Sequence, residues 1–141
     1  MLRKHTVRDW MMELVVIVEP DTIVSEALST MRRRYINSVI VNKTEVHPLY
    51  GIVTSRDICD KIVAEEKDPK KVKVSEIMSS PLITVNQSVF IQDCAKLMKE
   101  NKIHHLPVVD DEEKIVGMIS ASDFLVVAEG MGSNFEDRAL T

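Results

Sequence analysis

The sequence is poor in the features that mark disulfide scaffolds, membrane proteins and nucleic-acid-binding proteins. It has two cysteines in 141 residues, too few for a disulfide framework. Its longest apolar run, residues 14–18, is much shorter than the roughly 20 residues that cross a bilayer. With 18 basic and 22 acidic residues the net charge is −4, which provides no general attraction to nucleic acid or anionic lipid. No apolar stretch follows the basic N-terminus, so we predict no signal peptide and expect a cytoplasmic protein.

What the sequence does contain is an internal duplication, which is sought before any single motif. The pattern Val-x-(Asp/Glu)-x-Met occurs at residues 7–11 and again at 74–78. The pattern Gly-x-(Ile/Val)-(Ser/Thr)-x-x-Asp occurs at 51–57 and again at 117–123. We therefore divide the chain into a first repeat at 1–64 with its core at 7–64, a polar linker at 65–73, a second repeat at 74–129 and a tail at 130–141.

Each repeat is predicted to fold in the order β-α-β-β-α. Short apolar runs bounded by turn residues indicate strands, and apolar residues at helical spacing indicate the helices between and after them. A mixture of this kind is typical of an α/β (α+β) fold with small sheets flanked by helices. A repeat of about 60 residues buries too little surface to be stable alone, so we expect the two copies to pack together. The predicted strands are 14–18, 38–41 and 50–54 in the first repeat, and 82–85, 106–109 and 115–120 in the second.

Residues suited to binding a nucleotide gather where the last strand of each repeat passes into a helix. The hydroxyls of Thr54 and Ser120 and the charge of Arg56 suit a phosphate, which a helix N-terminus also attracts. The carboxylates of Asp57 and Asp123 suit the two hydroxyls of a ribose, as in dinucleotide-binding folds. Ser, Thr and Asp at a helix start are also common N-caps. The recurrence of the pattern in both copies favours a binding site.

These motifs, with an amphipathic helix ending in Met and the sequence Leu-Pro-Val-Val-Asp at 106–110, resemble a tandem pair of cystathionine-β-synthase (CBS) domains over residues 7–129. The resemblance implies one pseudo-two-fold module, often called a Bateman module, with two ligand clefts between the copies. It also implies an adenine nucleotide ligand (AMP, ADP or ATP), with S-adenosylmethionine as a further possibility, and assembly into a homodimer.

The resemblance further implies that each cleft joins the Asp motif of one copy to the first strand of the other. Apolar residues would enclose the adenine, the aspartate would hold the ribose and the hydroxyls would hold phosphate. Because Arg56 is the only cation inside either Asp motif, the cleft with Thr54 and Asp57 is expected to take the more anionic ligand. The first cleft is expected to contain Thr54, Arg56, Asp57, Ile83, Ile103 and His104, and the second Ser120, Ser122, Asp123, Val16, Ile36 and Asn37.

Two classes of function remain open from the sequence. The first is a regulatory, energy- or metabolite-sensing module that binds adenine nucleotide. The second is a protein-interaction or dimerisation module whose clefts are empty or vestigial. No nucleophile–base pair indicates an enzyme, and no Cys or carboxylate spacing completes a metal site with His104 and His105. No cofactor is required by either reading. The physiological ligand, the partner protein and the role of the tail stay undetermined.

Overall fold

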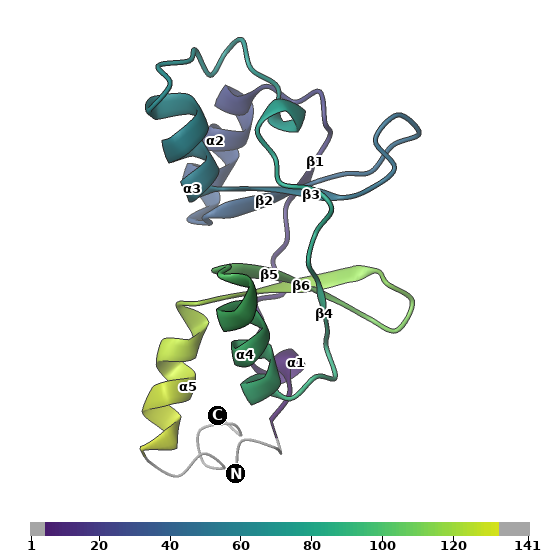
Figure 1. Ribbon diagram of the computed structural model, residues 1–141, viewed down its shortest axis with the longest axis vertical. Helices are drawn as coiled ribbons and strands as arrows, with labels where there is room; N and C mark the ends of the chain where they lie inside the picture. Colours follow the sequence, from purple (N-terminus) through teal and green to yellow (C-terminus); the bar gives the residue numbers. More distant parts are fainter. Residues whose placement is uncertain (1–4, 133–141) are drawn as a thin grey trace. The chain divides into compact units, whose positions relative to one another are not determined.

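The computed structural model describes residues 5–132, which form two compact units (Figure 1). The first unit is Val15–Leu82, and the second joins the chain up to Leu14 to the chain from Ile83 onward. Each unit has one three-stranded sheet flanked by helices. The fold is therefore α+β, as the sequence predicted.

In the first unit the sheet has the order β1-β2-β3, with β1 parallel and β3 antiparallel to the central strand. Ser38 at the start of β2 pairs with Thr54 at the end of β3, so the start of the central strand lies beside the strand-to-helix junction. The elements are β1 (Ile17–Val18), α2 (Val24–Arg34), β2 (Ser38–Val41), β3 (Gly51–Thr54), α3 (Ser55–Ile58) and a π-helical turn (Cys59–Val63) that continues α3.

The second unit repeats this plan with the order β4-β5-β6. His105 at the start of its central strand pairs with Ser120 at the end of β6. The helices α2 and α4 both end on a residue in the left-handed conformation, Tyr35 and Lys102 respectively. The elements are α1 (Val7–Trp10), β4 (Val85–Asn86), α4 (Ile91–Asn101), β5 (His105–Val109), β6 (Ile115–Ser120) and α5 (Asp123–Met131).

The segment that opens each sequence repeat belongs to the unit built by the other repeat. Val7 of α1 is fully buried in the same core cluster as Ile91 and Leu106 of the second unit. Val74, in the 3-10 turn Val74–Glu76, is fully buried in the first unit's core with Val24. The compact units thus differ from the sequence divisions at 1–64 and 74–129, because the two opening segments are exchanged.

The residues of the opening motif each have a structural role. The acidic residue closes the turn: a carboxylate oxygen of Asp9 accepts the Thr6 N–H at 2.9 Å, and Glu76 accepts the Lys73 N–H at 2.6 Å. The methionines pack against the glycines of the Asp motifs, Met11 on Gly117 and Met78 on Gly51. A Cβ on either glycine would collide with the methionine side chain, so this close approach explains why both motifs carry glycine.

Several boundaries differ from the prediction. The first strands β1 and β4 have two residues each, shorter than the expected 14–18 and 82–85. Helix α5 continues to Met131, so the expected tail at 130–141 begins inside a helix, and its residues 133–141 lie outside the described part.

Cys59, which lies in an apolar helical pattern, is exposed, whereas Cys94 is buried. Within residues 5–132, no helix is long and apolar enough to cross a bilayer.

Candidate functional site

The predicted residues Thr54 and Asp57 form a capping box at the start of α3. The Thr54 N–H donates to Asp57 Oδ2 at 2.8 Å, and the Thr54 hydroxyl donates to the same oxygen at 3.2 Å. In return, the Asp57 N–H donates to Thr54 Oγ1 at 3.4 Å. The N-cap reading of these two residues is therefore confirmed. The capping box uses only Oδ2 of Asp57, so the role of Oδ1 must be explained by another contact.

The equivalent residues of the second repeat make the first two of these contacts. The Ser120 N–H donates to Asp123 Oδ2 at 2.8 Å, and the Ser120 hydroxyl donates to that oxygen at 3.3 Å. The hydroxyls of Ser120 and Ser122 lie 2.9 Å apart. Two hydroxyls and one carboxylate thus gather at the start of α5. This cluster has the donors and acceptors that the sequence analysis expected of a nucleotide site.

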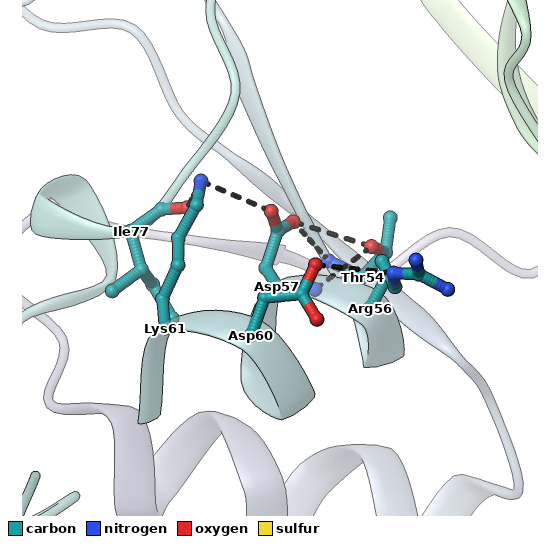
Figure 2. Close-up of polar contacts among 6 residues, drawn as sticks. All are labelled: Thr54, Arg56, Asp57, Asp60, Lys61 and Ile77. Carbon is teal, nitrogen blue, oxygen red and sulfur yellow. Dashed lines mark hydrogen bonds and ion pairs between the residues drawn. The ribbon is translucent and has the colours of Figure 1, made fainter. Parts of the chain in front are cut away.

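The two carboxylates differ in what holds their second oxygen (Figure 2). Lys61 Nζ lies 3.1 Å from Asp57 Oδ1, and the same ammonium group donates to the Ile77 carbonyl oxygen at 2.8 Å. Asp57 therefore has both oxygens engaged, with its side chain only 12% exposed. No cation in the described part of the chain forms an ion pair with Asp123. Counted from the aligned motif glycines, the position equivalent to Lys61 is Val127, a buried core residue.

Arg56, the cation that distinguished the first motif in the sequence, is also paired. Its Nε lies 3.0 Å from Asp60 Oδ2, one helical turn along the chain (Figure 2). The Arg56 side chain is 84% exposed, so the pair is weak and screened by solvent. Even so, the neighbouring carboxylate offsets the charge that was expected to attract an anionic ligand. The two motifs therefore differ in their charged contacts, but the difference does not come from Arg56 alone.

Within each unit, the residue before the central strand lies against the junction. The Ser55 N–H donates to the Asn37 carbonyl oxygen at 3.0 Å, and the Ala121 N–H donates to the His104 carbonyl oxygen at 2.9 Å. Asn37 and the preceding Ile36 are thus brought to the first junction. Ile103 and His104 are brought to the second.

A groove lies at this position in both units, between the end of one helix and the start of the next. The first, of about 1110 Å³, is lined among others by Ile36, Asn37 and Ser55. The second, of about 500 Å³, is lined by the equivalent Ile103, His104 and Ala121. Each groove also carries basic side chains, which are Arg32 and Arg33 in the first and Lys99 and Lys102 in the second.

The twelve predicted residues divide evenly between the two units. Each predicted cleft draws half of its residues from one unit and half from the other, so its assembly stays a prediction. The Val16 carbonyl accepts the N–H of Ile40 in the central strand at 2.9 Å, and Ile83 is 42% exposed. The first unit holds Val16, Ile36, Asn37, Thr54, Arg56 and Asp57, and the second holds Ile83, Ile103, His104, Ser120, Ser122 and Asp123.

Sequence reasoning missed Lys61. A signal for it was present, because a lysine four residues after an aspartate on a helix is placed to form an ion pair. Its second contact, with the Ile77 carbonyl, spans 16 residues along the chain and has no signal in the sequence.

The model of the CBS domain family matches this chain twice, at residues 7–64 and 74–130. A protein of Methanopyrus kandleri is 33% identical over 87% of this chain and 62% of its own length. The CBS domain-containing protein YhcV of Bacillus subtilis is 32% identical over 86% of this chain and 84% of its own length. Inosine-5'-monophosphate dehydrogenase of Methanocaldococcus jannaschii is 34% identical over 79% of this chain, which spans only 21% of that enzyme. The similarity to the dehydrogenase thus concerns a small part of it.

Solved structures agree with the family match. A hexameric CBS-CP12 protein from bloom-forming cyanobacteria superposes with a TM-score of 0.83 at 29% identity, covering 92% of this chain and 74% of that chain. The CBS domain pair of protein MJ0100, in complex with 5'-methylthioadenosine and S-adenosyl-L-methionine, superposes with a TM-score of 0.76 at 25% identity. That alignment covers 89% of this chain and 97% of that one.

Proposed function

The chain belongs to the CBS-domain family, and from this premise we propose that it is a regulatory module that binds an adenosine-containing ligand. AMP, ADP and ATP are the proposed ligands, with S-adenosylmethionine as the alternative. One observation carries the proposal: a hydroxyl, a carboxylate and a groove with basic side chains occur together at the same junction in both units. The adenosine compounds bound by the MJ0100 domain pair support this ligand class.

The Asp123 motif is the better candidate for holding the ribose. A carboxylate has about four acceptor positions, and only Oδ2 of Asp123 is used, by Ser120. Its other oxygen can accept two ribose hydroxyls without breaking any contact of the folded chain. Helix α5 begins at this residue and has nine residues, so its positive end favours a phosphate. Lys99 and Lys102 in the adjoining groove add positive charge.

This assignment changes the order expected from the sequence, which favoured the cleft with Thr54 and Asp57. That expectation rested on Arg56 as the only cation inside either Asp motif. Because Arg56 is paired with Asp60 and Asp57 with Lys61, the first motif has no unpaired cation to distinguish it and offers fewer free acceptors. We therefore place the tighter site at Asp123 and the weaker one at Asp57.

Ligand binding would regulate the module by changing the populations of its alternative arrangements. A ligand that contacts one arrangement of the module better than another shifts the equilibrium toward that arrangement, which a partner protein or a second copy can then recognise. Apolar side chains on helix α5 support assembly into a homodimer, because Leu125 is 73% and Val126 48% exposed. Exposed apolar residues grouped on one helix are typical of an interface.

The second candidate function is an interaction or dimerisation module without a ligand. The same apolar face of α5 and the engagement of both Asp57 oxygens by Thr54 and Lys61 favour it. Native mass spectrometry and thermal unfolding with adenosine, AMP, ATP and S-adenosylmethionine separate the two candidates. A ligand that binds only the folded chain raises its melting temperature by mass action. No bound mass and no rise in melting temperature at millimolar ligand would leave the interaction module as the better description.

The matched variants Asp123→Ala and Asp57→Ala test the assignment of the sites. Each removes a carboxylate that accepts the N–H and the hydroxyl of the residue three positions earlier, and Asp57→Ala also removes the ion pair with Lys61. Loss of one charge-assisted hydrogen bond costs roughly 1.5–3 kcal/mol, so Asp123→Ala should weaken the tight site by about tenfold or more. Asp57→Ala should leave that site nearly unchanged in a calorimetric titration with AMP. The opposite pattern would restore the order expected from the sequence.

A further inference from the structure

We infer that Lys61 is a selectivity residue that keeps the ribose of a ligand away from Asp57 and so directs it to Asp123. The inference rests on the proposed adenosine-binding function. It concerns a side chain outside both Asp motifs, four residues beyond the aspartate of the first. Lys61 acts by occupying the acceptor that the ribose would need.

The contacts of Lys61 account for this competition. Its Nζ lies 3.1 Å from Asp57 Oδ1 and 2.8 Å from the Ile77 carbonyl oxygen, to which it donates (Figure 2). The lysine side chain is 44% exposed, whereas that of Asp57 is 12% exposed. The ammonium group therefore lies against Oδ1, the oxygen that Thr54 does not use, on a carboxylate that is mostly buried. A ribose hydroxyl reaching Asp57 must share this oxygen with a cation or displace it.

The two aspartates differ in the number of acceptor positions that stay free for the hydroxyls of a ribose. Of the roughly four acceptor positions on a carboxylate, Asp57 uses two on Oδ2 for Thr54 and one on Oδ1 for Lys61. One position remains, too few for both hydroxyls of a ribose. Asp123 uses only the two on Oδ2 for Ser120, and both hydroxyls can be accepted at Oδ1.

The second contact of Lys61 makes its displacement more costly than that of a surface lysine. Moving the ammonium group away from Asp57 also removes a donor from the Ile77 carbonyl. Ile77 is buried in the first unit's core and directly follows the 3-10 turn Val74–Glu76. Two residues later, Ser79 pairs with Ile52 of β3. A ligand that opens the Asp57–Lys61 pair would therefore also loosen the segment that opens the second repeat.

The experiment follows adenosine binding at each motif separately by ¹H–¹⁵N NMR of the full chain. The Thr54 and Ser120 amides both donate to the carboxylates in question, so each resonance reports on one aspartate. Adenosine has no phosphate, so removal of a lysine charge does not itself weaken an attraction to the ligand. Four proteins are compared, the wild type, Lys61→Met, Lys61→Arg and Lys67→Met. The last removes the same charge from an exposed position of the first unit.

In the wild type and in Lys67→Met, adenosine should shift the Ser120 amide at concentrations that leave the Thr54 amide unchanged. In Lys61→Met the Thr54 amide should also respond, with affinity at that motif raised by about tenfold or more, the effect of one freed charge-assisted acceptor. Lys61→Arg should behave as the wild type, because a guanidinium can still pair with Asp57. Should Lys61→Met fail to fold, Lys61→Gln keeps a neutral donor for the Ile77 carbonyl.

Three results would overturn the inference while leaving the proposed function intact. The first is a wild-type Thr54 response at the same adenosine concentration as Ser120. The second is a Thr54 amide that stays unresponsive in a folded Lys61 variant. The third is weaker binding at Thr54 without the lysine, which would make Lys61 a ligand contact. If neither amide responds to adenosine or AMP in any of the proteins, the inference and the proposed function both fail.

Discussion

Replacing Val7 by alanine should destabilise the second unit, although Val7 lies in the first sequence repeat. Val7 is fully buried in the cluster that contains Ile91, Leu106 and Ile119. The change removes two methyl groups, about 0.8 kcal/mol each in transfer free energy. The cavity left behind brings the expected loss to roughly 2–3 kcal/mol. The melting temperature of the affected unit should fall by about 10 °C or more.

Hydrogen exchange measured by mass spectrometry locates the effect. A loss of about 2 kcal/mol accelerates exchange through opening of the affected unit by roughly 30-fold. In Val7→Ala the faster amides should lie in α4, β5 and β6. The matched variant Val74→Ala, at a residue equally buried in the first unit, should instead accelerate exchange in α2, β2 and β3. Arg8→Ala, at an exposed position of α1, should accelerate neither set.

The opposite pattern of exchange would refute the placement of Val7 in the core of the second unit. If Val7→Ala accelerated exchange in α2 and β2 and left α4 and β5 protected, each opening segment would pack within its own repeat. Equal acceleration throughout in both variants would mean that the two units open as one. The structure is supported only if each substitution accelerates amide exchange in the unit that is built mainly by the other repeat.

Two further predictions concern the close-packed glycines and the cysteines. Gly117→Ala should cost more stability than Gly51→Ala in chemical denaturation, with a loss of roughly 1–3 kcal/mol. A Cβ at Gly117 would lie 2.9 Å from the Met12 backbone oxygen, whereas at Gly51 the three nearest atoms all belong to the Met78 side chain; equal losses would contradict this. Burial raises the pKa of the Cys94 thiol to about 11, so at pH 8 it holds almost no thiolate. An aromatic disulfide reagent should therefore titrate one thiol, the exposed Cys59, and reach the second only after unfolding; two rapidly reacting thiols would contradict this.

Much of the fold could be read from the sequence, because hydrophobic periodicity and turn residues act locally. The strand at 38–41 and the strand at 115–120 have their predicted bounds. The Asp motifs lie where each strand meets a helix, as predicted. The short first strands were overestimated, because a run of apolar residues does not show how many of them find a pairing partner. Of the five residues at 14–18, Ile17 and Val18 are paired in register with the central strand, and Val16 adds a carbonyl hydrogen bond to Ile40.

The sequence by itself determined the duplication, the order of elements, the CBS-domain motifs and the residues that cap α3. Each of these depends on residues close together in the chain or on patterns that repeat. The tertiary structure alone decided which core each opening segment enters, because Val7 and Val74 belong to motifs of the same pattern, which does not distinguish the two cores. It alone also decided that the two aspartates are unequal. Lys61 is held over Asp57 by the carbonyl of Ile77, and that contact exists only because folding brings the opening segment of the second repeat against the first unit.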